Sequence, residues 1–426
     1  MATIGFFPLQ ETSHINATFG LAKQLQARGH RVCYLAPLDF EEYIRVQGLD
    51  FIPFSPTLFP KGVQQRIMST PGTVEKIWER AFGMLCNGEL DEVVKNSQFD
   101  LLVVDTWAQQ MALIAYKVGV PTILLSPTLP AARDIRVPPT TEAIVPDSLL
   151  AKLKVRLWWY RYDLQRLRLY LKNETAGYVQ PMKTLAASAN YPLRQLDTTG
   201  PSAVMKLFPE LILSPEAFDL PRSKKDERIR YIGALVDLAR KDDAPFPEGQ
   251  ICSNKKLVYC ALGMLSYRFK GAKDFLRMII DAVAPQQDWQ LVMSTGEHLD
   301  PVDFGQLPEN VILVNRAPQL KILRRAAVII THGGLNTIKE SILLGVPMII
   351  FPWSRPVNGV RVAYHGLGLM GDVNKVSVEQ IQAMIETIDK DPSFKARVEA
   401  MRQRFLAAES SEAGVKLIET FLAPPR

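Results

Sequence analysis

Short apolar runs alternate with stretches of helical periodicity along most of the chain. The runs with the length of a strand are residues 3–8, 31–36, 101–105, 122–126, 256–262, 290–294, 311–314, 327–331 and 347–351. The first of them is followed by a helical pattern over residues 16–28. Strands that are apolar throughout indicate parallel sheets covered on both faces. With right-handed crossovers, the pattern predicts an α/β class of doubly wound sheets.

A polar segment separates two series of these strands. Residues 214–250 are rich in proline, lysine and aspartate, which is typical of a linker. We therefore expect two Rossmann-like domains facing a central cleft, with the N-terminal domain at 1–235, a linker at 236–250 and the C-terminal domain at 251–405. Functional residues of such sheets gather at the carboxyl ends of the strands.

Composition narrows the class of protein. Of the 426 residues, 47% are hydrophobic and 22% are charged, which excludes a disordered chain and a coiled-coil rod. We find neither an apolar run of about 18 residues nor a basic leader, so we expect no membrane span and no signal peptide. The four cysteines lack metal-ligand spacing, which favours a reducing cytoplasm. A net charge of +6, without a clustered basic face, does not indicate nucleic-acid binding.

In the first half, two residues could carry acid–base chemistry. His14 lies between the end of the first predicted strand and a helix, and Asp105 closes the strand at 101–105. A carboxylate can orient an imidazole and stabilise its protonated form, so the two could form a dyad. The alternatives are a structural histidine and an aspartate that caps the following helix.

In the second half, a strand runs into Thr331-His332-Gly333-Gly334, and a helix is predicted from about Leu335. Glycines allow close backbone approach, and a helix N-terminus offers N–H groups to a phosphate. Glu340, one turn into the helix, could accept hydrogen bonds from a ribose. The alternative is a glycine-rich turn that only links strand to helix.

The residues between Arg316 and Gly368 resemble the donor signature of inverting nucleotide-sugar glycosyltransferases of the GT-B fold, which include UDP-glycosyltransferases and macrolide glycosyltransferases. Local likeness to zeaxanthin glucosyltransferases lies in Thr331-His332, in Gly334-Leu335-Asn336-Thr337 and in Tyr364-His365-Gly366. The first half resembles the family through His14, Gly29-His30-Arg31-Val32 and Asp105. The resemblance also implies a C-terminal helix, 406–426, that crosses back to the first domain.

The resemblance implies roles for matching residues. His14 would deprotonate the acceptor hydroxyl and Asp105 would orient it. His332, Gly334, Asn336 and Thr337 would face the diphosphate, with Gly263 near the phosphates. Glu340 would hold the ribose, and Gln319 the ribose or the base edge.

Three positions depart from the family pattern. Ser354-Arg355 stand where the family usually carries an Asp-Gln pair that holds the sugar hydroxyls. An arginine there could bind a uronic acid, fold onto the diphosphate or accompany a loss of transfer. Arg316 replaces a tryptophan that stacks on uracil in plant members, and Met264 replaces a hydroxyl residue near the phosphates.

Residues 152–172 mix basic and aromatic side chains at helical spacing. They could form an interfacial helix at anionic lipid, line the acceptor pocket, or present a solvated basic face. Phe82 and Trp107 are further candidates for acceptor binding. The sequence therefore leaves open a peripheral membrane contact beside a cytoplasmic location.

The predicted function is transfer of a sugar from a UDP or TDP sugar to a hydroxyl of a lipophilic acceptor, such as a polyketide, macrolide, terpenoid or carotenoid. We expect no metal and no cofactor beyond the nucleotide sugar, no nucleic-acid partner, and a monomer or homodimer. The alternative is a glycosyltransferase-like protein that no longer transfers sugar and acts as an auxiliary protein or uses His14 for other acid–base chemistry. A nicotinamide enzyme is disfavoured because the first strand-to-helix loop lacks Gly-x-Gly-x-x-Gly.

Overall fold

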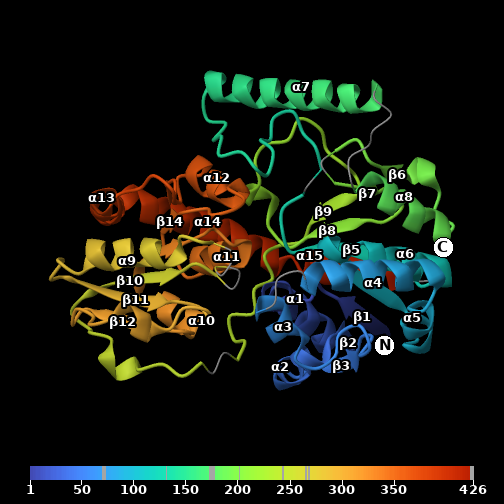
Figure 1. Cartoon of the computed structure of the whole chain (residues 1–426), viewed down its shortest axis with the longest axis horizontal. Coiled ribbons are helices and arrows are strands. Elements are labelled where there is room, and N and C mark those ends of the chain that lie inside the picture. Colours follow the sequence, from blue (N-terminus) through green and yellow to red (C-terminus); the bar gives the residue numbers. More distant parts are fainter. Residues whose placement is uncertain are drawn as a thin grey trace.

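The computed structural model contains two parallel sheets, each flanked by helices (Figure 1). It describes residues 1–69, 73–130, 132–171, 178–200, 202–241, 244–263, 266 and 269–422. Met264, Lys172 and residues 423–426, which entered the sequence predictions, lie outside this range. The two-sheet architecture confirms the predicted α/β class.

The first sheet has seven strands in the order β3-β2-β1-β4-β5-β8-β9, all of them paired in parallel. The strands are β1 (Thr3–Phe7), β2 (Arg31–Ala36), β3 (Asp50–Pro53), β4 (Leu101–Asp105), β5 (Thr122–Ser126), β8 (Glu210–Ile212) and β9 (Ile229–Tyr231). Its helices are α1 (Thr12–Ala27), α2 (Glu41–Val46), α3 (Val63–Ser69), α4 (Thr73–Asn87), α5 (Asp91–Asn96), α6 (Gln110–Val118), α7 (Leu149–Leu171) and α8 (Val179–Ser188). A separate antiparallel pair is formed by β6 (Leu196–Asp197) and β7 (Val204–Met205).

The second sheet has six strands in the order β12-β11-β10-β13-β14-β15, again all parallel. The strands are β10 (Lys256–Ala261), β11 (Trp289–Ser294), β12 (Val311–Val314), β13 (Ala326–Thr331), β14 (Met348–Ile350) and β15 (Gly368–Met370). Its helices are α9 (Ala272–Val283), α10 (Gln319–Leu323), α11 (Leu335–Leu343), α12 (Val357–Tyr364), α13 (Val378–Lys390) and α14 (Pro392–Ser410). The last helix, α15 (Ala413–Leu422), packs against the first half. The sequence located five of these strands to within about a residue or two, but it missed β15.

The segment expected to be a linker, residues 214–250, is partly structured. It contains a 3-10 turn, η4 (Glu216–Phe218), and β9, which pairs with β8 at the edge of the first sheet. The expectation that all of residues 214–250 form a linker was therefore wrong for the part before Ile232. The reason is that β9 is only three residues long and includes the exposed Arg230, so that it lacks the apolar run of a buried strand.

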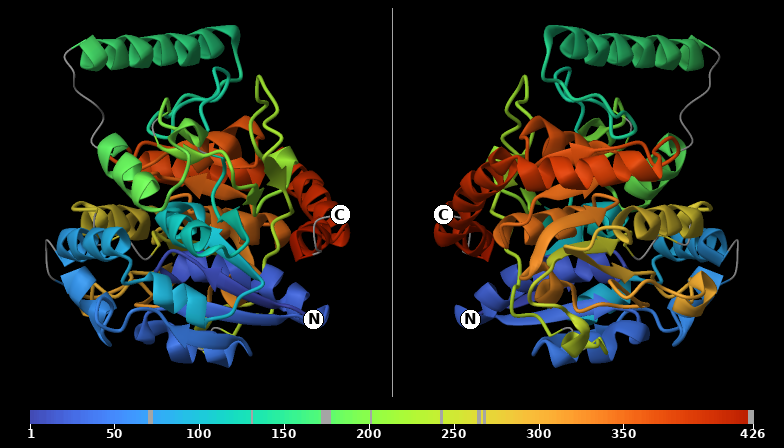
Figure 2. Two further views of the ribbon diagram at one scale, coloured as in Figure 1. Left: turned by 90° about the vertical axis from the view of Figure 1, so that its right-hand side faces the viewer. Right: turned by 90° about the vertical axis from the view of Figure 1, so that its left-hand side faces the viewer.

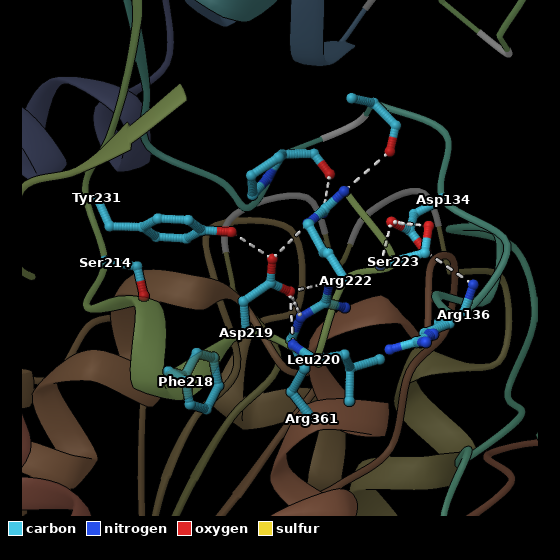
Figure 3. A network of polar contacts seen from close by, with 12 residues as sticks. Asp134, Arg136, Ser214, Phe218, Asp219, Leu220, Arg222, Ser223, Tyr231 and Arg361 are labelled. Atoms are coloured by element: carbon cyan, nitrogen blue, oxygen red, sulfur yellow. Dashed lines mark hydrogen bonds and ion pairs between the residues drawn. The ribbon is translucent and has the colours of Figure 1, made fainter. Parts of the chain in front are cut away.

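A buried network of charges connects this segment to the second half (Figure 3). The Asp219 carboxylate accepts hydrogen bonds from the Arg361 guanidinium of α12 at 2.5 and 2.8 Å. It also accepts from Arg222 Nε at 2.9 Å and from the Tyr231 hydroxyl at 2.6 Å. Arg222 in turn donates to the carbonyls of Pro130 and Ala132, in the loop after β5.

The electrostatics of Asp219 follow from these partners. Burial raises the pKa of this carboxyl, but the two guanidinium groups outweigh burial and lower the pKa to about 2. Asp219 is therefore ionised at neutral pH and balances a cation from each half. Because unpairing a buried charge is costly, this network holds the halves in one arrangement.

The end of the chain returns to the first half. Val415 and Ile418 of α15 are buried in the same apolar cluster as Ile15 and Phe19 of α1. His30, before β2, contacts Glu419 of α15 at 3.4 Å. The C-terminal helix thus covers α1, the helix that carries His14.

Candidate active site

The first part of the site lies at the carboxyl ends of two neighbouring strands. Because β1 and β4 pair in parallel, the loop after β1 and the end of β4 meet at one edge of the sheet. His14, in the first turn of α1, and Asp105, the last residue of β4, are joined there by a 2.7 Å contact between Nδ1 and Oδ2. The structure thus brings together the two residues that the sequence proposed as a dyad.

Asp105 also performs the alternative role that the sequence suggested. Its Oδ1 accepts the Trp107 backbone N–H at 2.8 Å and so caps the 3-10 turn that follows β4. Its Oδ2 additionally accepts the Leu9 backbone N–H at 3.2 Å. The same carboxylate therefore caps the 3-10 turn and orients His14, and its three hydrogen-bonding partners hold it in place.

The protonation of His14 reflects two opposing effects. Burial alone would lower the pKa of the imidazole, but the Asp105 carboxylate outweighs burial and raises that pKa above 6.5. With Nδ1–H donating to Asp105, the ring nitrogen available to take a proton is Nε2. An imidazole whose pKa is raised and whose Nδ1 is held by a carboxylate has the arrangement that a general base requires.

Trp107 forms one wall next to the imidazole. Its ring meets the His14 ring edge-on, with 5.8 Å between centroids. On the other half of the molecule, Arg355 places its guanidinium over the same indole at 5.0 Å. A residue expected on the acceptor side and one expected on the donor side therefore touch.

The second part of the site is the turn between β13 and α11. Gly333 has a φ of +91°, and a Cβ atom there would lie 2.8 Å from Ile350. Gly263, at the end of β10, has a φ of +81°, and a Cβ atom there would lie 2.4 Å from His332 Cε1. Glycine at position 263 allows the His332 ring to pack against the backbone, and glycine at position 333 leaves room for Ile350. The His332 ring lies beside the Trp353 ring, with 5.9 Å between centroids.

One ring nitrogen of His332 can still form a hydrogen bond. Burial lowers the pKa of its imidazole to about 4, so the ring is neutral at pH 7. Its Nδ1 has no hydrogen-bond partner among the described residues. An unsatisfied buried nitrogen beside a glycine turn and a helix N-terminus fits a site for an anionic ligand.

Glu340 in α11 and Gln319, the first residue of α10, form the third part of the site. Gln319 Nε2 donates to Glu340 Oε2 at 2.6 Å and contacts Thr337 Oγ1 at 3.3 Å. The other oxygen, Glu340 Oε1, accepts from Arg240 at 2.6 Å, and both of these side chains are almost fully buried. The sequence analysis missed Arg240 because it lies in a polar stretch without motif or periodicity.

Two contacts tie the halves together at this point. Asn336, at the start of α11, donates through Nδ2 to the Ser13 carbonyl, next to His14. Lys339, buried in the same helix, donates to the carbonyls of Leu213 and Ala234 at 3.1 and 3.4 Å. The N-terminus of α11 is therefore adjacent to the first turn of α1, which carries His14.

Three further residues predicted for the site are Ser354, Arg316 and Phe82. Ser354 is exposed in the loop before α12, and Arg316 is exposed after β12. Phe82 lies on α4 and packs against the apolar cluster that includes Phe54 and Met84. Phe82 is thus a partly buried residue at the side of this cluster, whereas Trp107 contacts His14.

The described residues also bear on two other features, a metal site and a membrane-spanning helix. We find no group of three or more histidine, cysteine, aspartate or glutamate side chains that could hold a metal ion. Within the same residues, the helices include none long and apolar enough to cross a membrane.

Two Rossmann-like domains with a dyad on one and a glycine-rich turn on the other define a GT-B protein. Residues 277–420 match the family described as erythromycin biosynthesis protein CIII-like, C-terminal domain. The NDP-glycosyltransferase YjiC of Bacillus subtilis (strain 168) is 24% identical over 421 residues, which cover 96% of this chain and 94% of the relative. The oleandomycin glycosyltransferase of Streptomyces antibioticus is 25% identical over 438 residues, 99% of this chain and 91% of the relative.

A solved structure agrees with this assignment. The glycosyltransferase of kitacinnamycin superimposes with a TM-score of 0.73 at 24% identity, covering 99% of both chains. Fold and sequence matches together identify the chain as a nucleotide-sugar glycosyltransferase of the GT-B fold. The resemblance inferred from the sequence is thereby confirmed, while the roles of individual site residues remain predictions.

Proposed function

We propose that the protein transfers a sugar from a UDP or TDP sugar to a hydroxyl of a lipophilic small molecule, with inversion and with His14 as general base. The observation that carries this proposal is the 2.7 Å contact between His14 and Asp105 beside the N-terminus of α11. A polyketide, macrolide, terpenoid or carotenoid would suit the acceptor, and macrolide transfer is supported by the oleandomycin relative.

In the proposed reaction, His14 Nε2 takes the proton from the acceptor hydroxyl. The acceptor oxygen then attacks the anomeric carbon while the bond from that carbon to the diphosphate breaks on the opposite face. Asp105 stabilises the imidazolium that forms, as its 2.7 Å contact to Nδ1 allows. In-line displacement inverts the anomeric configuration.

The second half would bind the leaving nucleotide. The diphosphate would lie at the N-terminus of α11, where backbone N–H groups and the His332 ring meet its charge without a metal. Glu340 would accept hydrogen bonds from the ribose, and Gln319 would contact the ribose or the base edge. Arg355 would lie near the sugar, because its guanidinium already reaches the Trp107 ring next to His14.

One observation favours the non-transferring alternative, an auxiliary protein or one using His14 for other chemistry. Both oxygens of Glu340 already accept hydrogen bonds, one from Arg240 and one from Gln319. A ribose must therefore share these oxygens or displace a partner. If neither occurs, the nucleotide site is closed and sugar transfer is lost.

The deciding experiment is calorimetric titration of the protein with UDP, TDP and GDP, followed by UDP-glucose and UDP-glucuronic acid. Micromolar binding of a diphosphate, followed by mass-spectrometric detection of a glycosylated acceptor, would support the transferase. Preference for the glucuronic acid donor would assign Arg355 to the sugar carboxylate. Absence of binding to all five compounds would favour the alternative.

A further inference from the structure

Helix α7 is the outermost element on its side of the molecule. It lies beyond the rest of the chain in Figure 1 and in both views of Figure 2, where its axis runs across the top of the body. The helix has 23 residues, which corresponds to a length of about 34 Å at 1.5 Å per residue. A flat surface can therefore contact its whole length without meeting another element.

One face of α7 anchors the helix to the body. Val155 and Trp159 are buried, and the Trp159 indole N–H donates to the Val137 carbonyl at 3.0 Å. Arg133, outside the helix, forms a two-point ion pair with Asp163 at 2.6 and 2.7 Å and lies over the Trp159 ring at 5.1 Å. These contacts fix which side of the helix faces outward.

The opposite face is an exposed apolar stripe. At 100° per residue, the stripe lies on the far side of the helix from Val155 and Trp159. Its side chains are between 38% and 86% exposed. The stripe consists of Leu149, Leu150, Leu153, Leu157, Tyr160, Leu164, Leu167 and Leu171. Such a row is far more than the scattered apolar residues of an ordinary surface.

Basic side chains border this stripe on both sides. Lys154, Arg161 and Arg168 lie along one edge, and Lys152 and Arg156 lie along the other. Residues 149–171 hold six basic residues and one acidic residue, Asp163, which already pairs with Arg133. This helix therefore supplies a surplus of five positive charges in a chain whose net charge is +6.

The basic residues beside the stripe distinguish between two partners that it could bind, a second copy of the helix and a lipid surface. From Leu150 to Leu171 the stripe residues are spaced alternately three and four apart, a repeat that could also pair with a second copy of the helix. In such a pair, however, the residues next to the seam would bring basic edges against basic edges, which is repulsive. An anionic lipid surface takes up the leucines and attracts both edges at once.

We propose that α7 is a membrane-docking helix that lies in the interface of an anionic bilayer, with its leucine stripe among the acyl chains and its basic edges at the headgroups. This proposal does not depend on sugar transfer. Docking would hold the protein at the surface where lipophilic molecules are concentrated.

Vesicle flotation of the full-length protein tests this proposal. We expect the protein to float with phosphatidylcholine vesicles that contain about 30% phosphatidylglycerol, and at least about tenfold less with pure phosphatidylcholine. Salt should weaken the binding because the basic edges act through screened charges. The combined variant L153Q/L157Q/L164Q should lose vesicle binding, and so should the combined variant K154E/R161E/R168E.

A matched control uses apolar residues that are equally exposed elsewhere. The variant L207Q/V302Q changes side chains that are 44% and 81% exposed, and should float as the parent does. Circular dichroism melting of each variant separates lost docking from lost folding. Unchanged flotation of a folded stripe variant would overturn the proposal. A parent that fails to float, but forms a dimer in light scattering that the stripe variant abolishes, would assign the stripe to a second copy instead.

Discussion

The two parts of the proposed active site differ in how much of their hydrogen-bonding capacity is already used. In the first half, every described contact of Asp105 directs it toward His14 and the turns that hold the pair. In the second half, His332 Nδ1 has no hydrogen-bond partner among the residues that the structure describes, and Glu340 is held by side chains that a ligand could replace. We therefore propose that the base is preorganised, whereas the donor site completes its contacts only when a nucleotide binds. Changes in the first half should affect turnover, and changes in the second should affect nucleotide affinity.

The largest effect is expected for His14→Ala. Removing the base should lower kcat by about 10²- to 10⁴-fold, because the acceptor hydroxyl then loses its proton to water alone. Calorimetry should show nearly unchanged nucleotide affinity, since His14 lies outside the second half. His298→Ala, which changes a histidine in the loop after β11 of the second half, serves as the control. Normal turnover by the His14 variant would refute the base role.

Asp105→Asn should lower kcat/KM by about 10- to 100-fold and shift its pH dependence. In the parent, activity should fall as the pH drops through the raised pKa of His14, above 6.5. Without the carboxylate, burial, which lowers this pKa, outweighs the smaller effect of the Glu11 charge, which raises it, and the Lys339 charge lowers the pKa further. The acidic limb of the profile should therefore move to lower pH. An unmoved limb would show that another group controls it.

Glu340→Ala tests the second half. Loss of the carboxylate should weaken nucleotide binding by about 10- to 100-fold, because a hydrogen bond to a charged group is lost. At saturating donor, kcat should change little. Glu248→Ala is the matched control, since Glu248 also forms an ion pair but is exposed. A variant with parental nucleotide affinity and reduced kcat would contradict the division in which the first half controls turnover and the second half controls nucleotide affinity.

The smallest effect is expected for Arg240→Ala. If Arg240 holds Glu340 in position, its loss should weaken nucleotide binding several-fold, by about 1 kcal/mol. Calorimetry at equal protein stability would measure this. Tighter binding would instead show that Arg240 competes with the ribose for Glu340. In that case a residue of the linker would limit access to the donor site.

The sequence located the parts of the site that depend on strand ends. Each of these parts lies at the end of an apolar strand or in the segment that follows it, as His14, Asp105 and the turn at His332 do. The pattern of strands was therefore enough to predict the edge of the sheet at which each part lies. Arg240 could not be found in this way, because its position depends on how a polar segment folds against α11. The contact between Arg355 and Trp107 was also out of reach, since it depends on how the two domains face each other.

The stripe of α7 illustrates a similar limit. Its basic and aromatic residues suggested three interpretations from the sequence, and only the structure separates the buried Trp159 from the exposed leucines. Side-chain chemistry along a helix is readable from the sequence, but the side that faces the body is set by contacts such as that of Trp159 with Val137.

The junction at Asp219 has a consequence for engineering by domain exchange. Hybrid enzymes that join the first half of one glycosyltransferase to the second half of another separate Asp219 from Arg361. A foreign second half without an arginine at that position would leave the aspartate with Arg222 as its one cation, beside the Tyr231 hydroxyl. A foreign first half without the aspartate would leave Arg361 buried without its carboxylate partner. A hybrid built from this chain should therefore carry Asp219, Arg222, Tyr231 and Arg361 as one unit.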